Sequence, residues 1–285
     1  MELSRFMKKQ QIKAKSNFKI NKTDLKIIRG LSEYRFLDTK QIIALNPGLS
    51  ERTIKRRLQY LFQAGFLDRP QSQFSYFSPS RYIIYTIGKK GMKLIDPDKK
   101  NNINIPKKNR RVKPLFLFHA LMVSNFRLAL SLTLKDEEES TLLRWRQNDL
   151  SDSVYVGSER LPVNPDGFFT IEDKGDLLHF FLEADRSTMT TKRFLNKMKA
   201  YWQWWLEEKC KDKLGVSKFR VLTITISEER KENLRRITRK ANEGKEGSNM
   251  FLFVCEKNYS IERPESILDP IWQSSRDDKY HHLLE

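Results

Sequence analysis

The sequence predicts an α/β protein with two domains, a small basic N-terminal domain and a larger C-terminal domain that mixes helices and strands. Three observations support this prediction. A chain of 285 residues is long enough for two ordinary domains. Residues 1–114 hold 27 Lys and Arg against 8 Asp and Glu, whereas residues 115–285 hold 27 against 28. Apolar residues recur at helical spacing in the first part, and strand-like segments become frequent in the second.

The composition argues against a membrane or secreted protein. With 39% hydrophobic and 32% charged residues, no window approaches the ~18 consecutive apolar residues of a membrane span. The N-terminal segment lacks the apolar core of a signal peptide, so we expect a cytoplasmic location and no membrane partner. Cys210 and Cys255 fit neither a metal motif nor a disulfide framework, and we expect both to be buried, reduced thiols.

The localised positive charge indicates a polyanionic partner. Each phosphate that a cation neutralises releases condensed counterions, and this release drives binding. A membrane surface is also anionic, but a helix that lies on it needs a continuous apolar face, which the basic N-terminal segment lacks. Nucleic acid is therefore the favoured partner.

Three helices are predicted between residues 23 and 65. The stretch TDLKIIRGLSEYRF has apolar residues at helical spacing behind a Thr23 cap. Asp38 and Gln41 have the spacing of a capping box at the start of the second helix, which the NPG sequence ends. The third helix, SERTIKRRLQYLFQAG, has Ser50 as its cap and Gly65 as its stop.

Two strands, FLDR and RYIIYTI, and a short helix, GKKGMKLI, follow the third helix. This order predicts a winged helix-turn-helix over residues 23–95, with the third helix in the major groove of duplex DNA. A protein-binding winged helix with an incidentally basic third helix is the alternative. The residues expected to contact DNA are Ser50, Arg52, Thr53, Lys55, Arg56 and Gln59 of the third helix, together with Arg69 and Arg81 of the strands.

Residues 96–114 hold three prolines and seven basic side chains, which is typical of a linker. The expected organisation is a basic tail over 1–22, the winged helix over 23–95, the linker over 96–114, a second domain over 115–275 and a C-terminal tail over 276–285.

Acidic residues gather in the second domain, in the segment LPVNPDGFFTIEDKGDLLHFFLEADRST. Lys174 and Gly175 suit the turn of a β-hairpin, since glycine accepts the positive φ that a tight turn needs. With the turn centred there, paired positions sum to 349, so Asp166 faces Glu183. Strand periodicity puts Asp185 on the same face as Glu183. We therefore expect these three carboxylates to converge.

Carboxylates at cross-strand distance repel one another. A metal ion, nearby Lys and Arg side chains, or a raised pKa must relieve the repulsion. Oxygen ligands of this kind suit Mg²⁺ or Mn²⁺. In the alternative interpretation Asp166 caps a turn, and Glu183 and Asp185 form salt bridges.

The motifs NPDGFFTIEDKG and LHFFLEADRST resemble the core of the PD-(D/E)XK nuclease superfamily. The expected order of elements also resembles that fold: a helix over 115–134, strands near 142, 163 and 177, a helix over 190–209, then strand, helix and strand. With the N-terminal winged helix, KMKAYWQ and the late LDPIWQ, most of residues 20–275 resembles the plasmid replication-relaxation family. The resemblance implies a restriction-endonuclease-like α/β/α domain.

The resemblance also implies roles for individual residues. Asp166 matches the metal-binding Asp of the motif and Glu183 its second acid, while Asp185 stands where the superfamily usually has a lysine. Some members supply that cation from the next helix, and Lys197 and Tyr201 resemble their Gln-x-x-x-Tyr element with Lys in place of Gln. All five are candidate catalytic residues, and Asp166, Glu183 and Asp185 are the candidate metal ligands.

Two functions are consistent with the resemblance. The first is a Mg²⁺- or Mn²⁺-dependent endonuclease that nicks or cleaves DNA in the replication, relaxation or transfer of a plasmid or mobile element. The second is a non-catalytic DNA-binding regulator of replication or transcription with a degenerate nuclease fold. The expected partners are double-stranded DNA and either a second copy of the chain or other mobile-element proteins.

Overall fold

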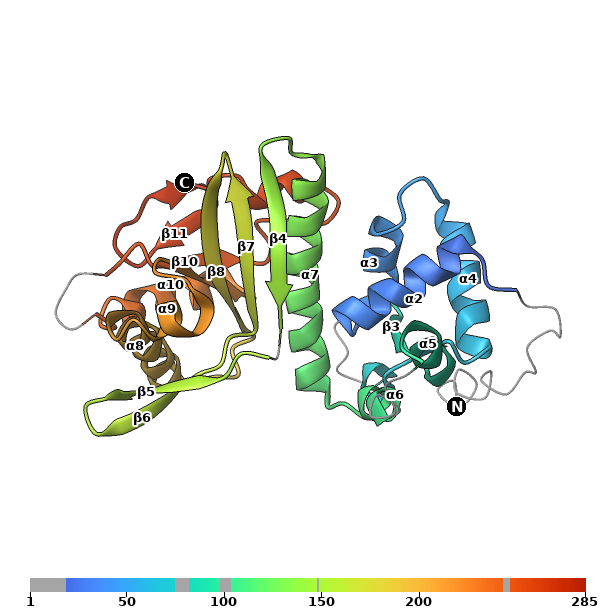
Figure 1. Ribbon diagram of the computed structural model, residues 1–285, viewed down its shortest axis with the longest axis horizontal. Helices are drawn as coiled ribbons and strands as arrows, with labels where there is room; N and C mark the ends of the chain where they lie inside the picture. Colours follow the sequence, from blue (N-terminus) through green and yellow to red (C-terminus); the bar gives the residue numbers. More distant parts are fainter. Residues whose placement is uncertain (1–18, 75–81, 98–103, 148, 243–246) are drawn as a thin grey trace. The chain divides into compact units, whose positions relative to one another are not determined.

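The protein is described by a computed structural model that covers residues 19–74, 82–97, 104–147, 149–242 and 247–285. The chain divides into two compact units, Met1–Leu128 and Ala129–Glu285. Both contain helices and strands (Figure 1), so the predicted α/β class is confirmed.

The first unit is built from short helices around a small antiparallel sheet. Its strands are β1 (Leu37–Asp38), β2 (Leu67–Asp68) and β3 (Ile84–Ile87), in the order β1-β3-β2. Its first five described α-helices are α2 (Lys22–Tyr34), α3 (Thr39–Ala44), α4 (Glu51–Gln63), α5 (Lys89–Ile95) and α6 (Ile105–Arg110). The sequence predicted all of these elements except β1 and α6.

The helix starts of the first unit follow the capping rules, with one correction. Ser50 caps α4 by accepting the Thr53 N–H, and Asp38 and Gln41 form the predicted capping box of α3. Thr23 is not the cap of α2. Asn21 is the cap, in a capping box with Asp24, because Asp24 sits at the third helical position and returns the hydrogen bond.

Helix α7 (Pro114–Asp136) contributes its first turns to the first unit. Leu117 and Phe118 pack in a cluster with Phe36 and Ile84, and Ser124 Oγ donates a hydrogen bond to Phe36 O at 3.0 Å. The boundary between the units lies at residues 128 and 129, within α7, rather than at the start of this helix.

Helix α7 is also long and apolar enough, by length and composition, to cross a membrane. No such segment was expected from the sequence. In this protein 56% of its most apolar stretch is buried inside the fold. A buried core helix passes the same test, so this helix is weak evidence for a membrane.

The second unit contains a seven-stranded sheet. It consists of β4 (Ser140–Arg146), β7 (Gly167–Asp173), β8 (Asp176–Asp185), β9 (Arg220–Thr225), β10 (Phe251–Cys255), β11 (Trp272–Ser274) and β12 (Tyr280–His281), in the order β12-β11-β10-β9-β8-β7-β4. Strands β8, β9 and β10 are mutually parallel, and the other pairs are antiparallel. Helices α8 (Thr191–Leu206), α9 (Lys209–Leu214) and α10 (Glu228–Thr238) complete this unit.

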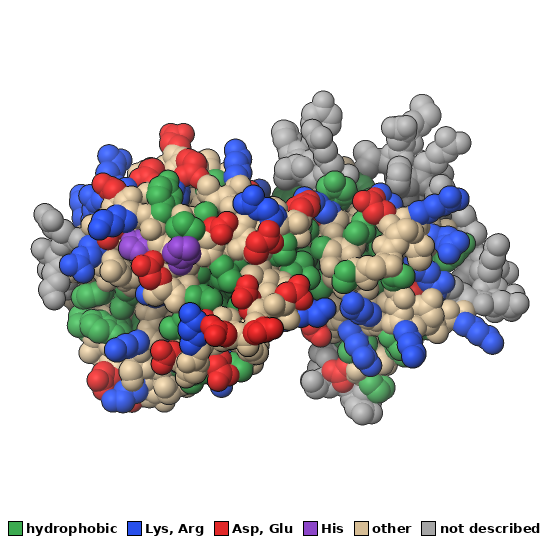
Figure 2. Space-filling view, turned by 90° about the horizontal axis from the view of Figure 1, so that it is seen from above, with side chains coloured by type: hydrophobic (Ala, Val, Ile, Leu, Met, Phe, Trp, Pro, Cys, Tyr) green, Lys and Arg blue, Asp and Glu red, His purple; other side chains and the backbone are tan. Residues whose placement is uncertain are grey.

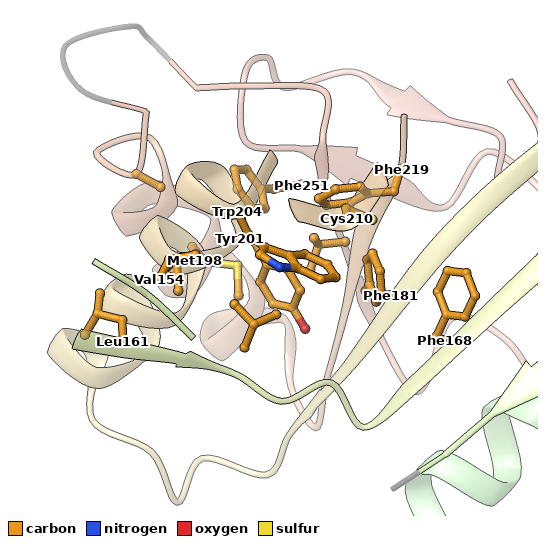
Figure 3. Close-up of a cluster of buried hydrophobic side chains, with 14 of the residues drawn as sticks. Val154, Leu161, Phe168, Phe181, Met198, Tyr201, Trp204, Cys210, Phe219 and Phe251 are labelled. Atoms are coloured by element: carbon orange, nitrogen blue, oxygen red, sulfur yellow. The ribbon is translucent and has the colours of Figure 1, made fainter. Parts of the chain in front are cut away.

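One hydrophobic core joins the sheet to α8. Figure 3 shows Tyr201 and Trp204 of α8 among Phe181 and Phe219. The ring centroids of Phe181 and Trp204 lie 5.4 Å apart, in an edge-to-face arrangement. This packing fixes the rotation of α8, and therefore which of its side chains face β8.

The β7–β8 hairpin has the register predicted from the sequence. Lys174 and Gly175 both have positive φ, 51° and 88°, as a type I′ turn requires. Asp173 pairs with Asp176 and Gly167 with Leu182, so the paired positions sum to 349.

A second hairpin lies outside the large sheet. Strands β5 (Asp152–Val156) and β6 (Glu159–Val163) pair only with each other among the described strands and pack against α8 (Figure 1). Val154 and Leu161 enter the common core, and Trp204 Nε1 donates to Asp152 Oδ2 at 2.8 Å. A strand was expected near residue 163 in the main sheet. The strand found there, β6, belongs to this arm instead, and the next strand along the chain, β7, is in the main sheet.

Candidate functional site

Asp166 and Glu183 lie beside each other at one end of β7 and β8. The Asp166 N–H donates to Leu182 O at 2.9 Å, which extends the hairpin ladder by one position. Asp166 Oδ2 in turn accepts the Ala184 N–H at 2.8 Å. The hairpin thus brings the two carboxyl groups together from positions 17 residues apart in the sequence.

Helix α8 adds a lysine and a tyrosine to this pair. Tyr201 Oη donates to Glu183 Oε1 at 2.6 Å, and Lys197 Nζ donates to Glu183 Oε2. The two residues are four apart and share one face of the helix. The structure therefore brings together Asp166, Glu183, Lys197 and Tyr201, four of the five candidate catalytic residues.

Burial controls the ionisation of this cluster. The pKa of Glu183 is raised to about 7, chiefly by burial and also by the nearby Asp166 carboxyl, while Lys197 opposes the shift. Burial lowers the pKa of Lys197, but Glu183 and Asp166 raise it by more, so the lysine stays protonated. Burial and Glu183 hold the pKa of Tyr201 well above its usual value, so its hydroxyl remains a donor.

Asp185 is not part of this cluster. Arg230 of α10 binds both of its oxygens, with Nε at 2.7 Å from Oδ1 and Nη2 at 2.9 Å from Oδ2. Among the residues that the structure describes, no three Asp, Glu, His or Cys side chains form a group that could hold a metal ion. The expected convergence of three carboxylates is therefore wrong, because Arg230 neutralises the third.

Arg230 was not predicted from the sequence as a residue of this site. Its Nη2 also donates to Met189 O at 2.7 Å, which ties the loop before α8 to the start of α10. Periodicity gives no signal for it, because Asp185 and Arg230 are 45 residues apart on non-consecutive elements. Only the parallel pairing of β8 with β9, followed directly by α10, could have indicated the contact.

Asp166 and Glu183 remain as candidate ligands of a divalent cation. Mg²⁺ is commonly held by one or two carboxylates together with waters and substrate phosphate oxygens. Asp166 and Glu183 offer two carboxyl groups, although both oxygens of Glu183 already accept hydrogen bonds, from Lys197 and Tyr201. Asp185 already has a cationic partner, since both of its oxygens bind the Arg230 guanidinium.

The predicted DNA-contacting residues of the first unit fall into two groups. Arg52, Lys55 and Arg56 are exposed on α4, and Figure 2 shows Lys and Arg side chains spread over this unit. Lys55 pairs with Glu51 of the preceding turn at 2.6 Å. Ser50 and Thr53 share a hydrogen bond at the helix start, between their hydroxyl oxygens at 2.9 Å.

Arg69 does not belong to this exposed face. It is 6% exposed, donates from Nη2 to Gln59 Oε1 and Tyr85 Oη at 3.0 Å each, and stacks on the Phe62 ring. These contacts hold β2 and β3 against α4. They also engage the side-chain oxygen of Gln59, another predicted DNA contact. Arg81 lies outside the described residues.

The chain matches a known protein family. A family model described as replication-relaxation matches residues 28–218. No curated protein and no solved structure matches the chain with significance. The matched region includes the exposed face of α4 and all four clustered residues, whereas Arg230 lies outside it.

Proposed function

This chain belongs to the replication-relaxation family, and from that premise we propose that it binds double-stranded DNA and cuts it in a metal-dependent reaction. The family points to a role in the replication or relaxation of a plasmid or other mobile element. DNA binding is assigned to the first unit and phosphodiester hydrolysis to the second.

The folds of the two units support this assignment. In the first, three helices and a strand pair have the order of a winged helix-turn-helix, and α4, with its exposed Arg52 and Arg56, is the recognition helix. In the second, a hairpin followed by a helix carries an Asp, a Glu and a Lys in the order of the PD-(D/E)XK superfamily.

The single observation that carries the enzymatic proposal is the cluster of Asp166, Glu183 and Lys197. Two acids and a lysine from three different elements meet at one end of the sheet, although burying such groups is costly. The hydrophobic core of a domain does not need such a cluster for its stability. Phosphodiester hydrolysis needs groups of this kind, to orient water and to balance the charge that develops on the phosphate.

Asp166 and Glu183 would hold the cation, which when bound would polarise the phosphate and favour ionisation of water. Without a cation the pKa of Glu183 is raised to about 7, so binding of the cation near neutral pH would be coupled to release of the Glu183 proton. Tyr201 fixes the orientation of the Glu183 carboxyl through the bond to Oε1. Lys197, held on the other oxygen, supplies positive charge to the incoming phosphate.

Asp185 favours a second candidate function. It stands where the superfamily usually has its lysine, and Arg230 closes it off. A degenerate nuclease fold that serves only as a scaffold would tolerate such a salt bridge. The chain would then be a non-catalytic DNA-binding regulator of replication or transcription.

A plasmid assay separates the two functions. With Mg²⁺ or Mn²⁺, the purified protein is expected to convert supercoiled plasmid to the open-circle or linear form. Asp166→Asn and Glu183→Gln should each abolish this conversion and leave duplex binding intact. Conversion that persists in the double variant would mean that another site or a contaminant cuts the DNA.

Duplex DNA binding is measured alongside the plasmid assay. Arg52→Ala with Arg56→Ala should weaken duplex binding. Arg236→Ala with Arg263→Ala, which removes two exposed arginines of the second unit, is the control and should leave duplex binding nearly unchanged. A protein that binds duplex DNA through α4 but never cuts, with any divalent cation, would establish the regulatory function instead.

A further inference from the structure

A groove of about 430 Å³ lies between the β5–β6 arm and the first turns of α8. The arm contributes Arg160 and Pro162, α8 contributes Arg193 and Lys197, and the chain that leads from the arm to Asp166 contributes Asn164. Lys197 is the point where the groove meets the catalytic cluster, since its Nζ is bonded to Glu183.

The cations of the groove are available to a ligand. Arg193 is exposed, and no described residue forms a hydrogen bond or ion pair with its guanidinium. Arg160 is exposed and uses Nε on Ser153 Oγ at 2.9 Å, which leaves its terminal nitrogens for a ligand. Both line the groove together with Lys197, and Arg193 lies in the first turn of α8, where the helix dipole also attracts anions.

The groove also has one acid, Glu159, whose carboxyl oxygens accept hydrogen bonds from Asn196 Nδ2 at 3.4 and 3.5 Å. Other lining residues suit the neutral parts of a nucleotide. Pro162 and Met189 offer apolar surface to a sugar or a base face. Asn164 is exposed, and its amide, which has no described hydrogen-bond partner, can both donate to and accept from a base edge. Cations for phosphate, apolar surface for the ring and an amide for the edge together describe a nucleotide rather than a bare anion.

Size decides between a duplex and a single strand. A volume of about 430 Å³ is near the lower end of the range for small-ligand pockets, roughly 300–1,000 Å³. It accommodates one nucleotide unit but not a base pair with its two backbones. A base that enters the groove must therefore be unpaired.

We propose that this groove binds one unpaired nucleotide of a single DNA strand and presents the adjacent phosphate to Asp166, Glu183 and Lys197. The inference rests on the proposed function for the fate of that phosphate. It specifies the substrate of the second unit, which binds a single DNA strand, whereas the first unit binds the duplex. The cut is then a nick in one strand.

Binding without metal tests the groove separately from cleavage. In EDTA, the affinities of the full-length protein for a short fluorescent single strand and for the matching duplex are measured by anisotropy. The test variant combines Arg160→Gln with Arg193→Gln. The control variant combines Arg236→Gln with Arg263→Gln, two exposed arginines of the same unit outside the groove.

The test variant is expected to lose about tenfold or more in single-strand affinity, about 1.4 kcal/mol per tenfold, while its duplex affinity changes by less than about twofold. Its salt slope for the single strand should fall by about 0.7 for each phosphate that the variant no longer neutralises. Unchanged tryptophan fluorescence checks folding, and Arg193→Lys should retain most of the single-strand affinity because the charge is kept.

The proposal is overturned if single-strand affinity falls no further than in the control, or if duplex affinity falls equally. Failure of the proposed function has a different signature: absence of metal-dependent cutting in the wild type, with the difference between test and control variants preserved.

Discussion

The ionisation of Glu183 should make the stability of the second unit depend on pH. The folded protein holds its pKa at about 7, against an ordinary value of 4.5, chiefly because the carboxyl is buried. A carboxyl whose pKa is raised on folding stabilises the fold below its unfolded pKa, and that stability is lost as pH rises through the folded pKa. A shift of this size corresponds to about 3 kcal/mol.

The perturbation is Glu183→Gln, which removes the titration and retains the side-chain shape. From pH 4.5 to 7, the free energy of unfolding of the wild type should fall by about 3 kcal/mol relative to the variant. Any constant cost of placing an amide beside Lys197 shifts the whole curve without changing this slope.

Urea denaturation followed by tryptophan fluorescence is the assay. All five tryptophans, Trp145, Trp202, Trp204, Trp205 and Trp272, lie in the second unit, so the signal reports that unit alone. Parallel curves for wild type and variant, or a wild type that gains stability over this window, would refute the reasoning about burial.

Three further predictions concern single contacts. Tyr201→Phe keeps the ring packing and removes a buried hydrogen bond to a carboxylate, so it should cost about 1.5–3 kcal/mol in urea denaturation and lower the rate of plasmid cutting. Arg230→Ala leaves Asp185 buried without its partner and should destabilise the second unit by about 3–5 kcal/mol; an effect below about 1 kcal/mol would show that the pair is dispensable. Arg52→Ala with Arg56→Ala should lower the salt slope of duplex binding by about 0.9 for each phosphate left without its arginine, and an unchanged slope would remove α4 from the DNA interface.

Local rules were sufficient for the part of the site that lies on the β7–β8 hairpin. The Lys174-Gly175 turn and the two-residue strand period fixed the register, and the register alone placed Asp166 against Glu183. The four-residue spacing of Lys197 and Tyr201 put both on one helical face, and both reach the same carboxyl. These contacts could be predicted because each depends on one or two neighbouring elements.

The contacts that escaped prediction depend on how distant elements pack. Strand periodicity indicates that Asp185 and Glu183 share a face of β8, but it carries no information about Arg230, which lies on α10 beyond a parallel crossover and binds Asp185. Arg69 was expected to be a DNA-contacting cation, but it is buried, because its guanidinium stacks on Phe62 and donates a hydrogen bond to Gln59. The β5–β6 arm resembled a strand of the main sheet because its alternation is the same in either setting.

The most direct test of the enzymatic account is whether Asp166 and Glu183 together hold a divalent cation. Electron paramagnetic resonance of Mn²⁺, titrated into the protein in the presence of duplex DNA, measures the bound ion. The account predicts saturable binding in the wild type that is lost in Asp166→Asn with Glu183→Gln and kept in Asp185→Asn. Equal binding by all three proteins, or none by the wild type, would contradict it.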